Sequence, residues 1–215
     1  MMKLYVADIK CLDDERDYEK YLYKVNEQRR AKVLRCKNKE DRLRTLLAGV
    51  LLSFGLENEG LRYDEVEFSV MPGGKPYIVS HPEVCFSLSH SGKYAVCAIA
   101  DENIGVDIEN KGRKLLLDCN QEKLVSVVKK VFSEEEYMVY NKCSKEEQIE
   151  FFLKLWTRKE AVSKAVGKGL AMNFSKICEP DEKFLSFWLN EEYYISVYSE
   201  NGKLQKEEVK ICMMN

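Results

Sequence analysis

The chain has 215 residues, of which 45% are hydrophobic and 33% charged, the composition of a globular protein long enough for one large domain or two small ones. Its 34 basic and 36 acidic side chains leave a formal net charge of −2, so the chain as a whole is not a polyanion binder and any basic site must be local. The N-terminus has the pattern of a strand and not of a signal peptide, and no stretch approaches about 18 consecutive apolar residues. We therefore expect a cytoplasmic protein without a membrane span.

The eight cysteines contain no CxxC pair, and only two histidines are present to complete a metal site. A structural zinc site is therefore not indicated. Without an export signal, disulfides are also not expected. We interpret the cysteines as free, partly buried thiols.

The apolar pattern predicts both helices and strands along the chain. The expected elements, in order, are a strand at 3–9, a helical region at 13–37, a helix at 39–54, strands at 66–70, 84–88, 94–100 and 104–108, a helical pattern at 124–131, a helix at 151–166, and two or three strands within 184–211. Residues 71–76 form a turn, and Asn201-Gly202 is the pattern of a hairpin turn.

Each half of the chain therefore holds antiparallel strands and a long helix that ends in Gly-Leu. This pattern predicts an α+β fold of two similar halves, with residues 1–103 in the N-terminal half and residues 104–215 in the C-terminal half. No low-complexity linker separates them, so we expect the halves to pack tightly.

An acidic motif, Ile104-Gly105-Val106-Asp107-Ile108-Glu109, alternates as a strand does. Its two carboxylates would point to one face, and its valine and second isoleucine to the core. Two carboxylates on one face repel each other unless a cation lies between them, and hard oxygen ligands suit magnesium. On this motif alone, an edge strand with a solvated acidic face is the more common explanation.

A second motif lies in the helix predicted at 151–166, where Trp156, Glu160 and Lys164 are four residues apart and share one face. An exposed Glu–Lys pair is the simple alternative. Because an indole usually seeks burial, it would draw this face inward. The motif alone favours a functional and a structural interpretation about equally.

A third cluster lies within Phe86-Ser87-Leu88-Ser89-His90-Ser91-Gly92, where Ser89 to Gly92 are expected at a turn between two strands. Its side chains and backbone amides could hold a phosphate, although a single histidine in a turn is more often structural. A Ser-His-Asp hydrolase is the alternative. The segment lacks a GxSxG elbow, and the serines flank the histidine too closely in sequence to establish a triad.

Basic residues gather between residues 29 and 44. Such a run is usually a solvated face, and a nucleic-acid-binding stripe is the alternative. Few aromatic residues lie among these charges, so a stacking platform for single strands is not indicated. A pocket for a few phosphates fits the modest charge better.

Together these segments resemble the 4'-phosphopantetheinyl transferases, in particular the two-domain, surfactin-synthetase-activating type that acts on carrier domains of fatty acid, polyketide or nonribosomal peptide synthesis. The family pattern (I/V)-G-(I/V)-D-(I/V)-E matches residues 104–109, and W-x-x-K-E-A-x-x-K-x-x-G-x-G matches residues 156–169. Two ordered motifs at this separation are far more specific than either alone. The resemblance implies two pseudo-symmetric halves with the active site in the cleft between them.

The resemblance also implies a role for each matching residue. Asp107, Glu109 and Glu160 would hold Mg²⁺ against the pyrophosphate of coenzyme A. Lys164 would contact the phosphate chain, and Lys159 would bind a phosphate or position the glutamate that follows it. The residues implied for the nucleotide are Ser89, His90, Arg29, Lys32 and Thr45 around the 3'-phosphate, and Gly74, Lys75 and Pro76 through backbone contacts near the adenine. An arginine at position 29 replaces an expected lysine and alters the geometry of that charge.

The implied reaction converts an apo carrier protein to its holo form. A serine hydroxyl of an acyl, polyketide or peptidyl carrier protein attacks the β-phosphorus of coenzyme A, which is the co-substrate, and 3',5'-ADP leaves. Positioning and charge neutralisation supply most of the catalysis of such a transfer. Our hypothesis for the base is Glu160, directly or through a water, with Lys164 as the main alternative. The resemblance adds Glu136 as a further candidate.

Two other classes of protein stay open as alternatives. A non-catalytic module that binds coenzyme A or a carrier protein would be expected to lack a metal ligand, and none is missing from the motifs. A nucleic-acid-binding protein would use residues 29–44, but the balanced charge and the absence of a recognised binding module argue against it. We expect a monomer that binds neither nucleic acid nor a membrane, since two halves in one chain can form a complete site.

Overall fold

The computed structural model describes residues 2–12, 14–112, 121–202 and 209–214. The first half contains β1 (Met2–Asp8), α1 (Glu15–Lys24), α2 (Glu27–Arg35), α3 (Lys39–Glu57), β2 (Phe68–Val70), β3 (Pro76–Ile78), β4 (Cys85–Ser91) and β5 (Tyr94–Ala100). The rest of the chain contains β6 (Ile104–Asn110), α5 (Gln121–Val131), α6 (Glu134–Tyr140), α7 (Lys145–Val166), β7 (Phe184–Leu189), β8 (Tyr193–Ser199) and β9 (Val209–Met214). Within the described ranges, no helix combines the length and the apolar composition that crossing a membrane requires.

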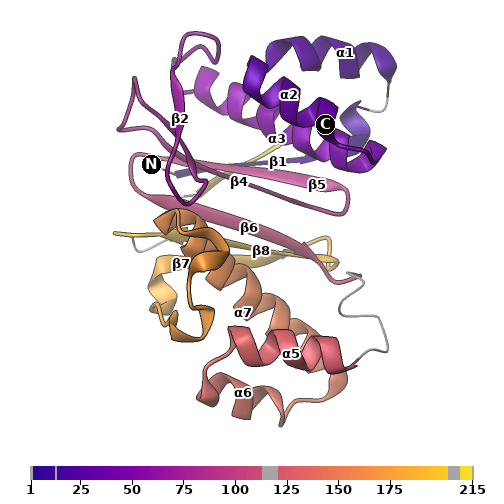
Figure 1. Cartoon of the computed structure of the whole chain (residues 1–215), viewed down its shortest axis with the longest axis vertical. Coiled ribbons are helices and arrows are strands. Elements are labelled where there is room, and N and C mark those ends of the chain that lie inside the picture. Colours follow the sequence, from indigo (N-terminus) through magenta and orange to yellow (C-terminus); the bar gives the residue numbers. More distant parts are fainter. Residues whose placement is uncertain (1, 13, 113–120, 203–208, 215) are drawn as a thin grey trace.

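Two sheets form the centre of the molecule, and helices cover the outer side of each (Figure 1). The first sheet has the strand order β4-β5-β1-β9, and the second is antiparallel with the order β6-β8-β7. Helices α1 to α3 lie on one outer side and α5 to α7 on the other. β2 and β3 form a separate two-stranded sheet. The predicted α+β fold is therefore confirmed, and each half contains one long helix.

Strand alternation distributes the apolar side chains between the layers. On β1, Leu4 and Val6 enter the core between the two sheets, whereas Tyr5 packs with the core that surrounds α3. On β6, Val106 and Ile108 belong to the core between the sheets. The side chains of β6 that alternate with these two therefore face the other way, toward α7.

Helix α3 is buried along most of its length, because it lies between the first sheet and the shorter helices α1 and α2. The Asn38 side chain caps its N-terminus by accepting hydrogen bonds from two backbone N–H groups of the first turn. Near its C-terminal end, a Cβ on Gly55 would lie 2.3 Å from Ile99 Cδ1, so the glycine permits close contact with β5. The helix predicted at 39–54 is confirmed and continues for three more residues.

Helix α7 is longer than its apolar pattern predicts, since it begins at Lys145 and not near residue 151. Ser144 and Glu147 form a capping box at its N-terminus. The first turns are polar, which is why the periodic pattern starts later. Gly167 ends the helix with a φ of 74°, a left-handed conformation that glycine adopts without strain.

Helix α7 lies directly against β6 because a glycine occupies the crossing point. A Cβ on Gly105 would lie only 1.8 Å from the carbonyl oxygen of Ala161, a separation that real atoms do not adopt. Asp107 and Glu109 occupy the same face of the strand as this glycine. The close approach therefore brings both carboxylates near α7.

Serine side chains join the two sheets along the adjacent edges of β4 and β6. Ser87 Oγ accepts a hydrogen bond from the Val106 N–H at 3.0 Å. Ser91 Oγ accepts one from the Asn110 N–H at 3.2 Å. Ser89 lies between them on the same face of β4 and also points to β6. We call these three residues the serine seam.

The predicted turn at Ser89-His90-Ser91 is wrong. β4 continues through Ser91, and the chain reverses at Gly92, whose φ is 52°. A Cβ on Gly92 would lie 2.3 Å from the hydroxyl of Tyr193, so glycine is required there for space as well as for conformation. Ser89 and Ser91, which suggested a turn, are strand residues whose hydroxyls bond to Asp107 and to the Asn110 N–H of β6.

The predicted hairpin turn at Asn201-Gly202 is also wrong. The hairpin of this region joins β7 to β8 through Asn190 and Glu191, both with positive φ. β8 and β9 cannot form a hairpin, because they belong to different sheets. Asn-Gly is a strong hairpin signal only when the two flanking strands pair with each other.

The expected boundary between residues 103 and 104 falls between β5 and β6, which belong to different sheets. The last strand departs from this division, because β9 pairs in parallel with β1. Parallel neighbours need a long crossover connection, and here the whole second sheet with its helices lies between the two strands in sequence. The C-terminal end of the chain thus completes the sheet of the first half.

Replacing Gly105 with alanine is expected to destabilise the protein by about 1–3 kcal/mol, because the added methyl group forces α7 away from β6. Urea unfolding followed by circular dichroism measures this change. Gly112→Ala is the control, since a Cβ there meets only the end of the Asn110 side chain. Equal unfolding midpoints for the two variants would contradict the close approach as described.

Candidate active site

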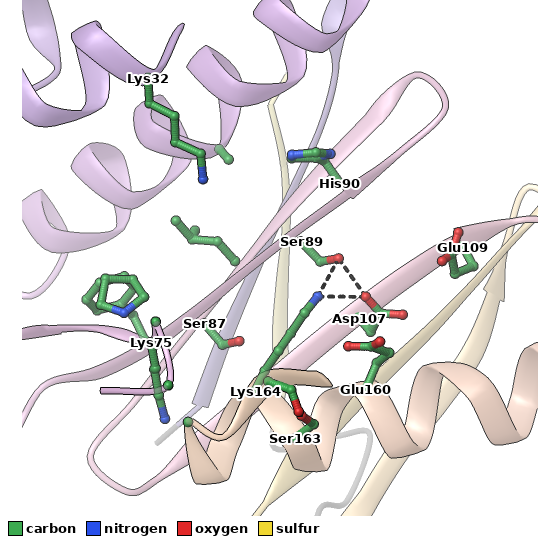
Figure 2. A pocket seen from close by; sticks show the side chains of 18 of the residues that line it. Lys32, Lys75, Ser87, Ser89, His90, Asp107, Glu109, Glu160, Ser163 and Lys164 are labelled. Atoms are coloured by element: carbon green, nitrogen blue, oxygen red, sulfur yellow. Dashed lines mark hydrogen bonds and ion pairs between the residues drawn. The ribbon is translucent and has the colours of Figure 1, made fainter. Parts of the chain in front are cut away.

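A cavity of about 610 Å³ opens where the two halves of the molecule meet (Figure 2). Six segments contribute to its lining: α2, α3, the turn before β3, β4, β6 and α7. The sequence-predicted site residues that line it are Arg29, Lys32, Gly74, Lys75, Pro76, Ser89, His90, Asp107, Glu109, Glu160 and Lys164. The fold therefore brings together residues from the four clusters singled out in the sequence.

At the centre of the cavity, Asp107, Lys164 and Ser89 form a closed triangle of contacts (Figure 2). Lys164 Nζ lies 2.7 Å from Asp107 Oδ1 and donates to Ser89 Oγ at 2.8 Å. Ser89 Oγ in turn donates to the same carboxylate oxygen at 2.8 Å. Because the Asp107 side chain is only 7% exposed, the ammonium group supplies the counter-charge that a buried carboxylate needs.

The second carboxylate oxygen of Asp107 has a different environment from the first. Oδ2 is buried, and no hydrogen-bond donor among the described residues reaches it. A buried carboxylate oxygen without a donor is costly, so it calls for an explanation such as a cation. The Glu160 carboxylate lies beside Asp107 in the cavity (Figure 2). The donor chemistry of these two carboxylates fits a hard divalent cation.

Glu109 lies farther along β6, and its carboxylate is directed away from Asp107 and Glu160 (Figure 2). Trp156 Nε1 donates to its Oε1 at 3.1 Å, and Ser91 Oγ donates to its Oε2 at 3.0 Å. Among the described residues, no group of three acidic, histidine or cysteine side chains is close enough to hold a metal ion. The three expected ligands share the cavity, but the structure does not gather them at one point.

The opposite side of the cavity is basic. Lys32 and His90 lie there, with their ring and ammonium nitrogens directed into the space between the halves (Figure 2). Desolvation and the nearby cations Arg44, Lys164 and Lys32 lower the pKa of His90. Desolvation and the guanidinium of Arg29 likewise lower the pKa of Lys32. Mutual repulsion among these cations favours an anion between them.

The turn at residues 73–76 closes one end of the cavity. Gly74 has a φ of 90°, and a Cβ on Gly73 would lie 1.7 Å from the carbonyl oxygen of Gly167, so this turn lies directly against the end of α7. Residues 73–76 all contribute to the cavity lining. The Lys75 side chain, however, extends away from Lys32 and His90 (Figure 2).

Three predicted site residues do not line the cavity. Thr45 is buried within α3, where its hydroxyl lies 3.5 Å from Cys36 Sγ. Lys159 is buried on another face of α7, and its Nζ contacts Glu136 Oε2 at 2.6 Å and two backbone carbonyl oxygens. Glu136 also belongs to the capping box of α6. A residue one position from Glu160 on a helix points about 100° away from it, which explains why adjacent motif residues separate.

Several lining residues were given no functional role from the sequence, although most of them belong to the motifs. They are Ala48, Gly73, Phe86, Ser87, Leu88, Ser163 and Gly167. Ser163 was detectable as part of the helical motif, and it donates from Oγ to the Gly169 carbonyl oxygen at 2.6 Å. Ser87 carried a signal as well, because it alternates with the two serines of the third cluster along a strand. Nothing in the local sequence distinguishes Ala48 from its neighbours in α3.

A basic surface that faces a carboxylate–lysine centre across one cavity is suited to a substrate that carries phosphate groups. Comparison with known proteins makes this specific. The model of the 4'-phosphopantetheinyl transferase superfamily matches residues 103–212, and that of the N-terminal domain of 4'-phosphopantetheinyl transferases matches residues 13–102. The chain belongs to the 4'-phosphopantetheinyl transferase superfamily.

Several relatives are named as phosphopantetheinyl transferases. The 4'-phosphopantetheinyl transferase Sfp of Bacillus subtilis is 33% identical over 172 residues, which are 80% of this chain and 73% of Sfp. The 4'-phosphopantetheinyl transferase gsp of Aneurinibacillus migulanus is 27% identical over 186 residues, 83% of this chain and 68% of gsp. The L-aminoadipate-semialdehyde dehydrogenase-phosphopantetheinyl transferase of Saccharomyces cerevisiae is 29% identical over 187 residues, 81% of this chain and 65% of that protein.

In the free protein, the imidazole of His90 is expected to titrate below the ordinary pKa of 6.5, because desolvation and nearby cations disfavour its charged form. At pH values just below 6.5, the unfolded chain therefore binds more protons at this histidine than the folded chain does. The histidine thus makes the free energy of unfolding rise with pH in that range. NMR titration of His81→Gln, which keeps a single histidine, measures the pKa. Arg44→Gln should move it upward, and a value at or above 6.5 would contradict the electrostatic description.

Proposed function

We propose that this protein transfers the 4'-phosphopantetheine arm of coenzyme A to a serine hydroxyl of an acyl, polyketide or peptidyl carrier protein, with Mg²⁺ as cofactor and 3',5'-ADP as the leaving product. The observation that carries the proposal is the Asp107–Lys164–Ser89 triangle facing the basic side of the same cavity. Membership of the superfamily supplies the reaction class. We further propose that the protein acts in the cytoplasm as a monomer.

The basic side of the cavity is assigned to the nucleotide. Three side chains of this side, Lys32, His90 and Arg29, are positively charged when protonated. They line a space in which we place the 3'-phosphate. The residues of the turn at 74–76 offer backbone groups for the adenine. The lowered pKa values of Lys32 and His90 mean that a bound phosphate, as a counter-charge, favours their protonated forms. Nucleotide binding and protonation of this side are therefore linked.

The carboxylates of Asp107 and Glu160 are assigned to the magnesium ion, with Glu109 as the third ligand. The buried Asp107 Oδ2, which lacks a donor, supports this assignment. Magnesium supplies charge neutralisation for the pyrophosphate when it is bound. Trp156 and Ser91 hold the Glu109 carboxylate in the free protein, so they set its position relative to the other two ligands. Lys159 and Glu136 are assigned the role of anchoring the helix that carries Glu160.

Glu160 is the proposed base for the carrier hydroxyl. It lies in the cavity, whereas Glu136 is bonded to Lys159 outside the cavity lining. Lys164 Nζ, the alternative base, already donates to Asp107, Ser89 and the Val106 carbonyl oxygen. An ammonium group with three acceptors is held as a donor, which suits it to contact the phosphate chain. The proton of the serine hydroxyl would thus move to Glu160 as the oxygen attacks phosphorus.

Intact-protein mass spectrometry tests the transfer. Apo carrier proteins of fatty acid, polyketide and nonribosomal peptide synthesis are each mixed with the protein, coenzyme A and Mg²⁺. We expect a mass gain of one phosphopantetheine arm on at least one carrier, abolished by EDTA and reduced on the order of a hundredfold or more in Asp107→Ala. Normal transfer by Glu160→Gln would remove that residue as the base. Tight binding of coenzyme A without transfer to any carrier would favour a binding module instead.

Substitution of Lys164 with methionine is expected to raise the affinity of the free protein for Mg²⁺, even though it removes a group needed for transfer. The reason is that the Lys164 ammonium lies 2.7 Å from Asp107 Oδ1 and repels a second cation at that carboxylate. Isothermal titration with Mg²⁺, without coenzyme A, measures the effect. Lys168→Met is the control, because that lysine is exposed beyond the end of the helix. Unchanged or weaker Mg²⁺ binding by Lys164→Met would contradict the prediction.

A further inference from the structure

Lys75 is in the turn assigned to the nucleotide, yet its side chain extends toward the second half of the molecule (Figure 2). Its Nζ donates to Asn103 Oδ1 at 2.6 Å, to the Ala165 carbonyl oxygen at 2.7 Å and to the Ile104 carbonyl oxygen at 3.4 Å. Asn103 directly precedes β6 and Ile104 begins it, whereas Ala165 lies in the last turn of α7, which is distant in sequence. One ammonium group therefore joins three parts of the chain.

The electrostatic setting of this ammonium group points to a structural purpose. All three of its acceptors are neutral, and desolvation lowers the pKa of Lys75, with Cys85 and Glu200 opposing that change. Removing a charge from water is unfavourable unless several hydrogen bonds compensate it. The C-terminal end of a helix carries partial negative charge and unsatisfied carbonyl groups. A cation with three well-placed acceptors at that end is stable there.

The contact lies close to the catalytic residues along the chain. Ala165 directly follows Lys164 in α7, and Ile104 begins the strand that carries Asp107. The neighbouring contact of Gly73 with Gly167 leaves no room for a side chain, so the turn and the helix end fit closely together. Lys75 thus fixes the distance between the nucleotide-binding turn and the helix end that presents Lys164.

Asn103 extends the network to the residue that follows β8, the middle strand of the second sheet. Its side-chain Nδ2 donates to Glu200 Oε2 at 3.0 Å, and its backbone carbonyl oxygen accepts from the Glu200 N–H at 3.1 Å. The acceptor that Lys75 uses is therefore itself held in place at the end of β8. A movement of the turn at 73–76 would have to break bonds to both α7 and this connection.

We propose that Lys75 is a positioning residue: its ammonium group ties the nucleotide-binding turn to the C-terminal end of α7 and thereby aligns Lys164 and Asp107 with the bound substrate. The inference rests on the proposed function, and it assigns a separate task to each part of one residue. The backbone of Lys75 serves the nucleotide, and its side chain serves the alignment of the second half. Lys75 itself does not touch the reacting atoms in this assignment.

Lys75→Met tests the proposal, because it removes the ammonium group and keeps most of the aliphatic chain. Hydrogen–deuterium exchange of the ligand-free protein is the first readout. We expect faster exchange in peptides that cover residues 160–167 and no change in peptides of α3. Lys168→Met is the matched control, since it removes an exposed positive charge near the same helix end and should leave exchange in these peptides unchanged.

The second readout separates positioning from nucleotide binding. In Lys75→Met, kcat for carrier modification should fall by about tenfold to a hundredfold, the cost of slight misalignment of a reacting group. The Kd for 3',5'-ADP, measured by calorimetry, should change by less than about threefold, because that ligand would use the basic side of the cavity and the backbone of the turn. Lys75→Arg should recover part of kcat, since it restores a cation that can reach the same carbonyl groups.

Two outcomes would overturn the proposal. One is unchanged exchange at the end of α7, and the other is a loss of 3',5'-ADP affinity that accounts for the whole loss in kcat/KM. The exchange readout needs no catalysis, so it stands even if no carrier is modified and the proposed function fails. Should Lys75→Met not fold, Asn103→Ala removes one of the three acceptors and should give a smaller change of the same kind in the same peptides.

Discussion

The structure depends on the way in which the edge of β4 meets the edge of β6. Two strand edges usually join through backbone hydrogen bonds, but here the hydroxyls of the serine seam supply the contacts. Side-chain bonds hold the strands farther apart than a backbone ladder would, and both sheets can diverge from this line. Ser87 and Ser89 of the seam line the cavity, whose basic side lies on one half and whose carboxylates lie on the other. The seam also bonds directly to two of those carboxylates, so the contact that joins the halves also orients the site.

A second constraint is the balance of charge around Asp107. This carboxylate is nearly buried, and burial of an isolated charge is unfavourable. Lys164 and Ser89 compensate one of its oxygens, and the other oxygen lacks a donor among the described residues. The ion pair thus stabilises the buried carboxylate in the folded protein, although Asp107 Oδ2 keeps no hydrogen-bond donor among the described residues. On the opposite side, desolvation and nearby cations disfavour the charged form of His90. A substrate that carries phosphates would supply a counter-charge there, and a cation would pair with the second oxygen of Asp107.

Close contact between backbone segments makes this arrangement possible. Gly105 lets α7 approach β6, and Gly73 lets the turn at residues 73–76 approach the end of α7. In both places the atom that a Cβ would meet is a backbone carbonyl oxygen, which cannot rotate away as a side chain can. The two glycines therefore set the position of α7 at both ends of the cavity. Lys75 adds a directional contact to the second of these approaches.

The sequence by itself determined the fold class, most elements and the residues around which the site is built. Strand alternation was sufficient to place Asp107 and Glu109 on one face of β6, and helical spacing was sufficient to place Trp156, Glu160 and Lys164 on one face of α7. These are local properties, because the direction of a side chain follows from the periodicity of its own element. The same reasoning fails where a polar residue serves a distant segment. Ser89 and Ser91 were for this reason predicted to lie in a turn, although they bond to another strand.

Only the tertiary structure decided which motif residues meet. Glu109 belongs to the acidic motif, yet its hydrogen bonds with Trp156 and Ser91 direct it away from Asp107. Lys159 precedes Glu160 in the motif but is buried against Glu136 on another face of the helix. The pairing of β9 with β1 was likewise not accessible from the sequence, because a parallel contact between the two ends of a chain has no local signature. Periodicity describes how one element presents its side chains, whereas the packing of elements determines the partners that those side chains find.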